Sequence, residues 1–120
     1  MSGKPDFAPV FEKLKSILQL YSQKLVVKAD TSENFSLDGA YSQKWKKEPF
    51  FGAVQVKKNY VSFYLMPVYM YPGLLENISP ELKKRMQGKS CFNFKKIDPA
   101  LFEELAQLTM QGFEKFVSEE

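Results

Sequence analysis

The sequence predicts an α+β protein: a single-domain, two-layer sandwich with two main helices on one face of an antiparallel sheet of about five strands. Three observations support this fold class. Apolar residues recur with helical spacing near both ends of the chain, and short segments between them alternate between apolar and polar residues. Strands are joined by short loops, which implies an antiparallel sheet. We therefore expect residues 1–120 to form one domain, which is long enough to bury a hydrophobic core.

The first helix is predicted over residues 7–21. Asp6 is a suitable N-cap, and Pro9 is tolerated because the first turn of a helix needs no donor from its N–H. Apolar residues then recur at steps of three and four positions, which places them on one helix face. They are Val10, Leu14, Ile17, Leu18 and Tyr21.

Two short strands follow, "LVVKA" and "FSL", with the turn "DTSEN" between them. Beyond the polar loop 38–49, two longer strands are predicted over Phe50–Lys57 and Tyr60–Met70. The turn Lys58-Asn59 joins them, and asparagine tolerates the positive φ that such two-residue turns require.

This turn predicts a register in which Gln55 faces Ser62 and Val54 faces Phe63, and alternate pairs share one face of the sheet. One face is then apolar throughout, with Val54, Val56, Val61, Phe63 and Leu65. The other face is mixed, with Ala53, Gln55, Lys57, Tyr60, Ser62, Tyr64 and Met66.

The C-terminal third adds a short helix, a strand and a long helix. Ser79 is a predicted N-cap with Pro80 at the first helical position, and Gly88 marks the stop. The segment "SCFNFK" alternates as a strand, and Asp98 caps a closing helix over 98–117.

The closing helix carries a broad apolar stripe that should face the sheet. We expect it to bury Leu105 and Phe113 against a phenylalanine of the sheet, namely Phe63, Phe92 or Phe94. Gly112 lies inside this helix, where glycine costs about 1 kcal/mol relative to alanine. Close packing against the sheet would explain it.

Helices on one side leave the second face of the sheet for water, a ligand or another chain. Tyrosine and methionine with a few amides are typical of binding surfaces, because they combine apolar bulk with hydrogen-bonding ends. The candidate ligand- or partner-binding residues are Gln55, Tyr60, Ser62, Tyr64, Met66, Cys91 and Asn93. Three interpretations stay open: a small-molecule or peptide site, a homodimer through sheet faces, or ordinary core covered by loop 38–49 with Trp45.

The net charge of +3 conceals a basic middle. Residues 44–96 contain eleven Lys or Arg and three Glu, a net charge of +8, whereas the remainder contains six Lys and eleven acidic residues, a net charge of −5. The candidate basic patch consists of Lys44, Lys46, Lys47, Lys83, Lys84, Arg85 and Lys89. Basic groups beside Trp45 suit single-stranded nucleic acid, but no recognised nucleic-acid motif is present, so a solvated surface is the preferred interpretation.

The residue inventory argues against enzyme chemistry and against a metal site. The chain has no histidine, which excludes Ser-His and Cys-His nucleophiles and the usual zinc sites. Cys91 is the single cysteine, and we expect it to be a reduced packing residue. No catalytic residue, metal ligand or cofactor is therefore predicted.

The N-terminus "MSGKPDFAPV" has no apolar stretch of the kind that signal peptides contain, and no run of eighteen apolar residues predicts a membrane span. Together with a single cysteine, this favours a cytoplasmic protein without a membrane partner.

The segments "FFGAVQVKKNYVSFYLMPVY" and "SPELKKRMQGKSCFNFKKIDPALFEELAQL" resemble the YdhG-like family of bacterial proteins of unknown function. The resemblance covers roughly residues 50–117, as a hairpin that ends in "YLMP", a small helix, a Gly-Lys turn into a strand, and a closing helix. It implies a frataxin-like α+β fold, and it implies a second possible function, that of an iron chaperone.

The iron-chaperone alternative needs an acidic ridge on the first helix and first strand. The first helix offers Asp6 and Glu12, and the nearest other carboxylates are Asp30, Glu33 and Asp38. Iron prefers clustered oxygen ligands or imidazole. We therefore prefer a binding or interaction module that uses the second sheet face.

Overall fold

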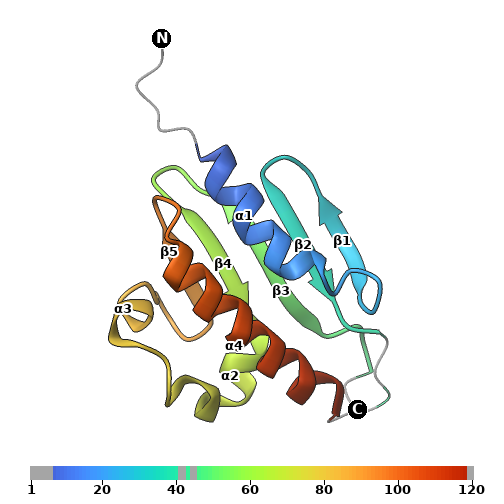
Figure 1. Cartoon of the computed structure of the whole chain (residues 1–120). Coiled ribbons are helices and arrows are strands. Elements are labelled where there is room, and N and C mark those ends of the chain that lie inside the picture. The colour runs from blue at the N-terminus through green and yellow to red at the C-terminus, as the bar shows by residue number, and fades with distance from the viewer. Residues whose placement is uncertain (1–6, 41–42, 44–45, 119–120) are drawn as a thin grey trace.

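The computed structural model describes residues 7–40, 43 and 46–118. In chain order its elements are α1 (Ala8–Gln19), β1 (Val26–Asp30), β2 (Asn34–Asp38), β3 (Phe50–Val56), β4 (Val61–Leu65), α2 (Met66–Met70), η1 (Pro72–Leu75), α3 (Pro80–Lys83), β5 (Cys91–Phe94) and α4 (Pro99–Ser118). The five strands form one sheet in the order β1-β2-β3-β4-β5, and every neighbouring pair is antiparallel. Helices α1 and α4 lie side by side across one face of this sheet (Figure 1). The predicted fold class is confirmed.

The hydrophobic core lies between the helices and the sheet. The fully buried side chains of α1 and α4, such as Leu14 and Leu105, pack with the apolar residues that β2 to β5 direct toward the helices. Phe94 of β5 and Phe102 of α4 meet edge to face, with 5.0 Å between ring centres. The predicted burial of Leu105 is confirmed, since none of its surface is exposed.

Phe113 packs elsewhere than predicted. Its ring is 4.7 Å from that of Tyr21 and 5.9 Å from that of Phe51, measured between ring centres. These replace the expected partners on β4 and β5. Phe113 lies two helical turns beyond Leu105, a rise of about 12 Å, and α4 crosses the sheet obliquely, so this part of the helix meets the start of β3 (Figure 1).

The β3–β4 hairpin has the predicted register. Gln55 pairs with Ser62 and Val54 pairs with Phe63, and the loop is closed by a 2.8 Å hydrogen bond from the Lys57 N–H to the Tyr60 carbonyl. Asn59 does not have the expected positive φ. Among the described non-glycine residues, it is Lys46 that has a positive φ.

The predicted strand Tyr60–Met70 is wrong beyond Leu65. The structure has β4 up to Leu65 and then the short helix α2 from Met66. Pro67 explains the change, because its missing N–H cannot donate to a sheet ladder, whereas its fixed φ suits the first turn of a helix. The apolar character of residues 66–70 therefore reflects packing of a helix under α4.

Helix ends follow the predicted caps where the structure describes them. The Leu82 N–H donates to Ser79 Oγ (3.1 Å), and the Leu101 N–H donates to Asp98 Oδ1 (3.3 Å). Asp6, the expected cap of α1, lies outside the described residues. Helix α3 ends at Lys83, well before Gly88, which has a φ of 82° in the turn that leads to β5.

The outer edge of β5 is covered by the segment that precedes it. The Asn93 N–H donates to the Arg85 carbonyl (2.8 Å), and the Gln87 N–H donates to the Cys91 carbonyl (2.9 Å). Met86 forms an isolated antiparallel bridge with Phe92. Residues 85–87 thus act as a short sixth row beside the sheet, which brings Arg85 and Gln87 next to its second face.

Candidate ligand-binding face of the sheet

The second face of the sheet is turned away from α1 and α4 (Figure 1). Strand pairing places Gln55 beside Ser62, Ser62 beside Asn93, and Tyr64 beside Cys91. This row of side chains crosses β3, β4 and β5 as the alternation of the sequence predicts. Trp45, which was considered as a cover for this face, lies outside the described residues.

Asn93 is the centre of a hydrogen-bond network on this face. Its Oδ1 accepts from Ser62 Oγ (2.7 Å) and from Cys91 Sγ (3.3 Å), and its Nδ2 donates to Gln87 Oε1 (2.7 Å). Ser62 is 1% exposed, although it lies on the side without helices. The network therefore holds the Asn93 amide in one orientation on this face.

Lys57 extends the network to β3. Its Nζ donates to Gln55 Oε1 (2.7 Å) and lies 5.8 Å from the centre of the Tyr64 ring. The predicted site residue Gln55 therefore holds the Lys57 ammonium near the Tyr64 ring. A cation over an aromatic face is attracted by its quadrupole, which fixes both groups further.

The face contains an open depression of about 380 Å³. Five predicted residues line it, Tyr60, Ser62, Tyr64, Cys91 and Asn93, and they are joined by Lys57 and Gln87. Gln55 lies beside the depression through its bond to Lys57. Met66 does not belong to it: the prediction placed Met66 on this face as a strand residue, but the strand ends one residue earlier and Met66 begins α2.

A second open depression of about 250 Å³ adjoins the first. The two share Tyr60, Gln87 and Asn93, and the second adds Met86 and three basic residues, Lys84, Arg85 and Lys95. Among the described residues that line the two depressions, none is acidic. The combined surface therefore joins hydrogen-bonding groups and tyrosine rings to four positive charges.

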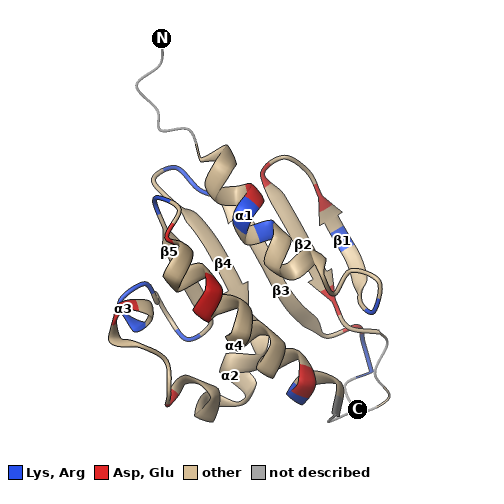
Figure 2. Ribbon diagram, in the orientation of Figure 1, with Lys and Arg blue, Asp and Glu red and all other residues tan. Residues whose placement is uncertain are grey.

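The basic residues predicted as one patch lie in two places (Figure 2). Lys83, Lys84 and Arg85 are at α3, whereas Lys46 and Lys47 are in the loop before β3, at the opposite corner of the molecule in this view. Lys44 lies outside the described residues. Lys89 follows α3, and its Nζ is 5.9 Å from the centre of the Tyr69 ring.

Four residues of this surface were absent from the predicted site: Lys57, Met86, Gln87 and Lys95. The alternation of β3 places Lys57 on the second face, and this signal was available in the sequence. The alternation of "SCFNFK" likewise places Lys95 on the face of Cys91 and Asn93. Met86 and Gln87 had no such signal, because residues 84–90 have no regular periodicity and only the pairing of residues 85–87 with β5 brings Gln87 to this face.

Cys91 is a poor nucleophile in this setting. Burial raises the pKa of its thiol above the ordinary value of 9.0, and this outweighs the lowering effects of hydrogen bonding by Ser62 and Tyr64 and of the Lys57 charge. The thiol is therefore neutral at neutral pH and acts as a weak hydrogen-bond donor to Asn93.

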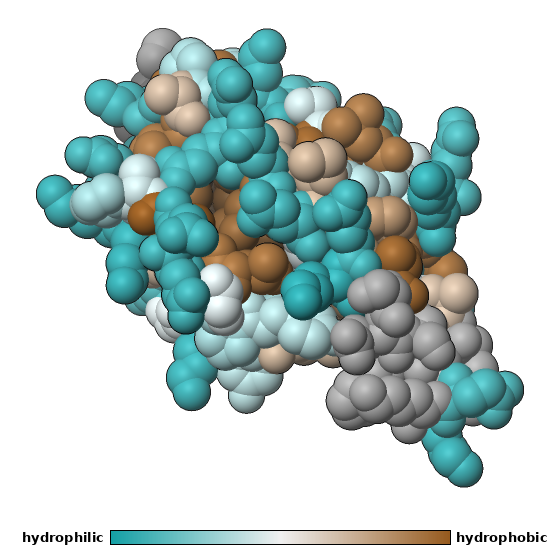
Figure 3. All heavy atoms as spheres, turned by 60° about the horizontal axis from the view of Figure 1, so that its bottom comes forward, coloured by the Kyte–Doolittle hydropathy of each residue, from teal (hydrophilic) through white to brown (hydrophobic). Residues whose placement is uncertain are grey.

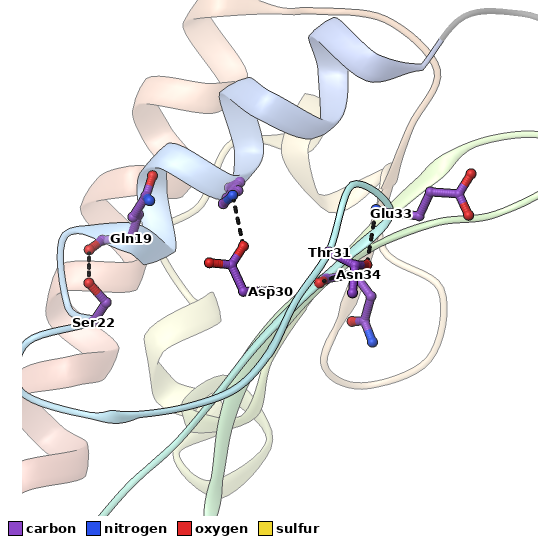
Figure 4. Close-up of polar contacts among 7 residues, drawn as sticks. Gln19, Ser22, Asp30, Thr31, Glu33 and Asn34 are labelled. Carbon is purple, nitrogen blue, oxygen red and sulfur yellow. Dashed lines mark hydrogen bonds and ion pairs between the residues drawn. The ribbon is translucent and has the colours of Figure 1, made fainter.

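The carboxylates considered for iron do not converge. Asp30 forms an ion pair with Lys15 of α1 (3.0 Å), and Glu33 points in the opposite direction from the same turn (Figure 4). Asp38 lies near the pair formed by Lys28 and Glu48 (2.6 Å). Within residues 7–40, 43 and 46–118, no group of three His, Cys, Asp or Glu residues could hold a metal ion.

Comparisons of the chain with protein-family models, curated proteins and solved structures found no significant match. The resemblance to the YdhG-like family therefore stays a prediction. In the described part of the chain, no helix has the length and apolar character needed to cross a membrane.

Proposed function

We propose that the protein is a binding module that holds a small, negatively charged ligand on the second face of its sheet. The observation that carries this proposal is the depression between Lys57, Tyr64 and Asn93, which continues into the second depression with Lys84, Arg85 and Lys95. An acidic group bound there would meet four cationic side chains and no lining carboxylate from the described residues.

The shape and chemistry of the surface favour a ligand with a flat ring and an anionic group. Tyr60 lines both depressions and Tyr64 lines the first, so a ring stacked on either tyrosine would have the basic residues within reach. The side-chain amides of Asn93 and Gln87 are already hydrogen-bonded to each other (2.7 Å). Such pre-ordering reduces the entropy lost on binding and supports a specific site.

Adenosine monophosphate is a suitable probe, because it combines a planar ring with a phosphate. Adenosine and inorganic phosphate are the matched controls, since each carries one of these two groups. We expect nuclear magnetic resonance titration of the isotope-labelled protein to shift the signals of Asn93, Gln87 and Ser62. Arg85→Gln and Lys57→Gln should each weaken binding about tenfold while leaving the fold intact. Lys58→Gln, in the exposed turn of the same hairpin, is the matched control.

Absence of any shift on this face with all three probes would contradict the proposal. Binding of adenosine and adenosine monophosphate with equal affinity would contradict its electrostatic part. An oligothymidylate that binds through Lys46 and Lys47 instead would support the alternative of a single-stranded nucleic-acid binder.

A further inference from the structure

A separate hollow lies at the corner where α2, η1 and the segment after α3 meet. Its volume is about 780 Å³, larger than that of either depression on the sheet face. In the view that brings this corner forward, hydrophobic side chains lie recessed between hydrophilic ones (Figure 3). The volume is within the range of small-molecule pockets, about 300–1,000 Å³.

The hollow is apolar in its floor and walls. Val68 is 1% exposed and belongs to the hydrophobic core, and Leu75 and Met86 are half-buried against the same core. Tyr69 lines the hollow too, and it is 54% exposed. A ligand seated here would cover apolar surface that is otherwise in contact with water.

Two lysines complete the lining, and they limit the kind of ligand. Lys83 and Lys89 are both exposed, and the Lys89 Nζ lies 5.9 Å from the centre of the Tyr69 ring. No acidic side chain belongs to the part of the lining that the structure describes. A neutral apolar ligand would gain nothing from these charges, and a small polar anion would gain nothing from Val68 and Leu75.

We propose that this hollow binds a free amphipathic anion, that is, one apolar chain with a terminal carboxylate, as in a medium-chain fatty acid. The chain lies on Val68, Leu75 and Met86, and the carboxylate lies between the ammonium groups of Lys83 and Lys89. Apolar burial supplies most of the affinity. The lysines select for the charged end and set the direction of the chain.

The test uses decanoate below its micelle concentration, with decanol of the same chain length as the neutral control. We expect decanoate to shift the resonances of Val68, Leu75 and Met86 in the folded protein and to bind about tenfold more tightly than decanol. Substitution of both lysines, Lys83→Gln with Lys89→Gln, should reduce decanoate affinity about tenfold and leave decanol affinity unchanged. Both lysines are exposed, so the double variant keeps the fold, which circular dichroism verifies.

Tyr69→Ala should weaken both ligands, whereas Arg85→Gln on the sheet face should weaken neither. Equal affinity for decanoate and decanol, or decanoate affinity that is unchanged in the double lysine variant, would overturn the proposal. So would resonance shifts confined to Ser62, Gln87 and Asn93, or binding to vesicles of anionic lipid without binding to monomeric decanoate. Failure here leaves the proposed sheet-face site unaffected, because the two sites share Met86 alone among their linings.

Discussion

Gly112 offers a test of how closely α4 packs on α2. It is buried in the interior of α4, and a Cβ at this position would lie 2.9 Å from Pro67 Cβ and 3.3 Å from Pro67 Cγ. Both contacts involve ring atoms of a proline inside a helix, which cannot move aside as the end of a flexible side chain can. Gly112→Ala therefore combines a gain in helix propensity with a steric overlap.

The two effects can be compared in size. Replacing glycine by alanine in a helix interior gains about 1 kcal/mol, and inserting a methyl group into a packed site costs about 1–3 kcal/mol. We expect Gly112→Ala to lower the free energy of unfolding by up to about 2 kcal/mol, and Gly112→Val to lower it further. Close packing thus explains the glycine that the sequence leaves in an otherwise strong helix, although the neighbour is Pro67 of α2 and not the sheet.

Urea denaturation followed by circular dichroism measures this difference. The exposed neighbour Gln111 provides the calibration: Gln111→Gly should cost close to the intrinsic helix penalty, because no packing is involved. Gly73→Ala is a second control, since no atom lies within 4 Å of a Cβ built there. A Gly112→Ala variant that is more stable than the parent by about 1 kcal/mol would show that α4 and α2 are not in close contact.

Four further predictions follow from buried or perturbed groups. Leu105→Ala removes a fully buried side chain and should cost about 2–5 kcal/mol in urea denaturation; a loss below 1 kcal/mol would contradict its place in the core. Burial favours the neutral acid of Asp38 in the folded state and so raises its pKa above 3.8. The protonated side chain therefore contributes to the free energy of unfolding at low pH, and this contribution is lost as pH rises through the folded pKa. Asp38→Asn should therefore raise the melting temperature at neutral pH. It should not raise the melting temperature at a pH well below the ordinary carboxyl pKa. A lower melting temperature of the variant at neutral pH would show that attraction of Asp38 by Lys28 dominates. Because the pKa of Cys91 is raised, its thiol should react with a labelling reagent at neutral pH more slowly than a model thiol, and faster reaction would contradict the raised pKa. Tyr64→Lys removes a stacking ring and should leave a stable monomer with a lower affinity for adenosine, the probe without a charge. A dimer that dissociates would favour the interface instead, and unfolding would show that this face is core.

The parts of the fold that the sequence predicted depend on local chemistry. A two-residue loop fixes which residues pair across the β3–β4 hairpin, so the register of Gln55 with Ser62 could be derived from a few positions. The caps Ser79 and Asp98 likewise act on N–H groups three residues away. The second face of the sheet could be anticipated for the same reason, since it needs only alternation within strands.

The missed parts depend on how separate segments pack or pair in the folded chain, with one exception. The partners of Phe113 follow from the oblique path of α4, and the role of Gln87 follows from pairing of an irregular segment with β5. The exception is the end of β4, where Pro67 was visible in the sequence as a residue that an interior strand excludes. There the missing N–H of Pro67 outweighs the apolar composition of the segment.

The covered edge of β5 limits how copies of this protein could assemble. Polymers built by edge pairing need an unpaired strand at both sides of each sheet, so that every added copy presents a new template. Here the N–H of Asn93 and the carbonyl of Cys91 are already bonded within the chain, which leaves β1 as the terminal strand with an outer side. Pairing of two β1 strands would use up that side in both copies, so edge pairing through β1 ends at a pair.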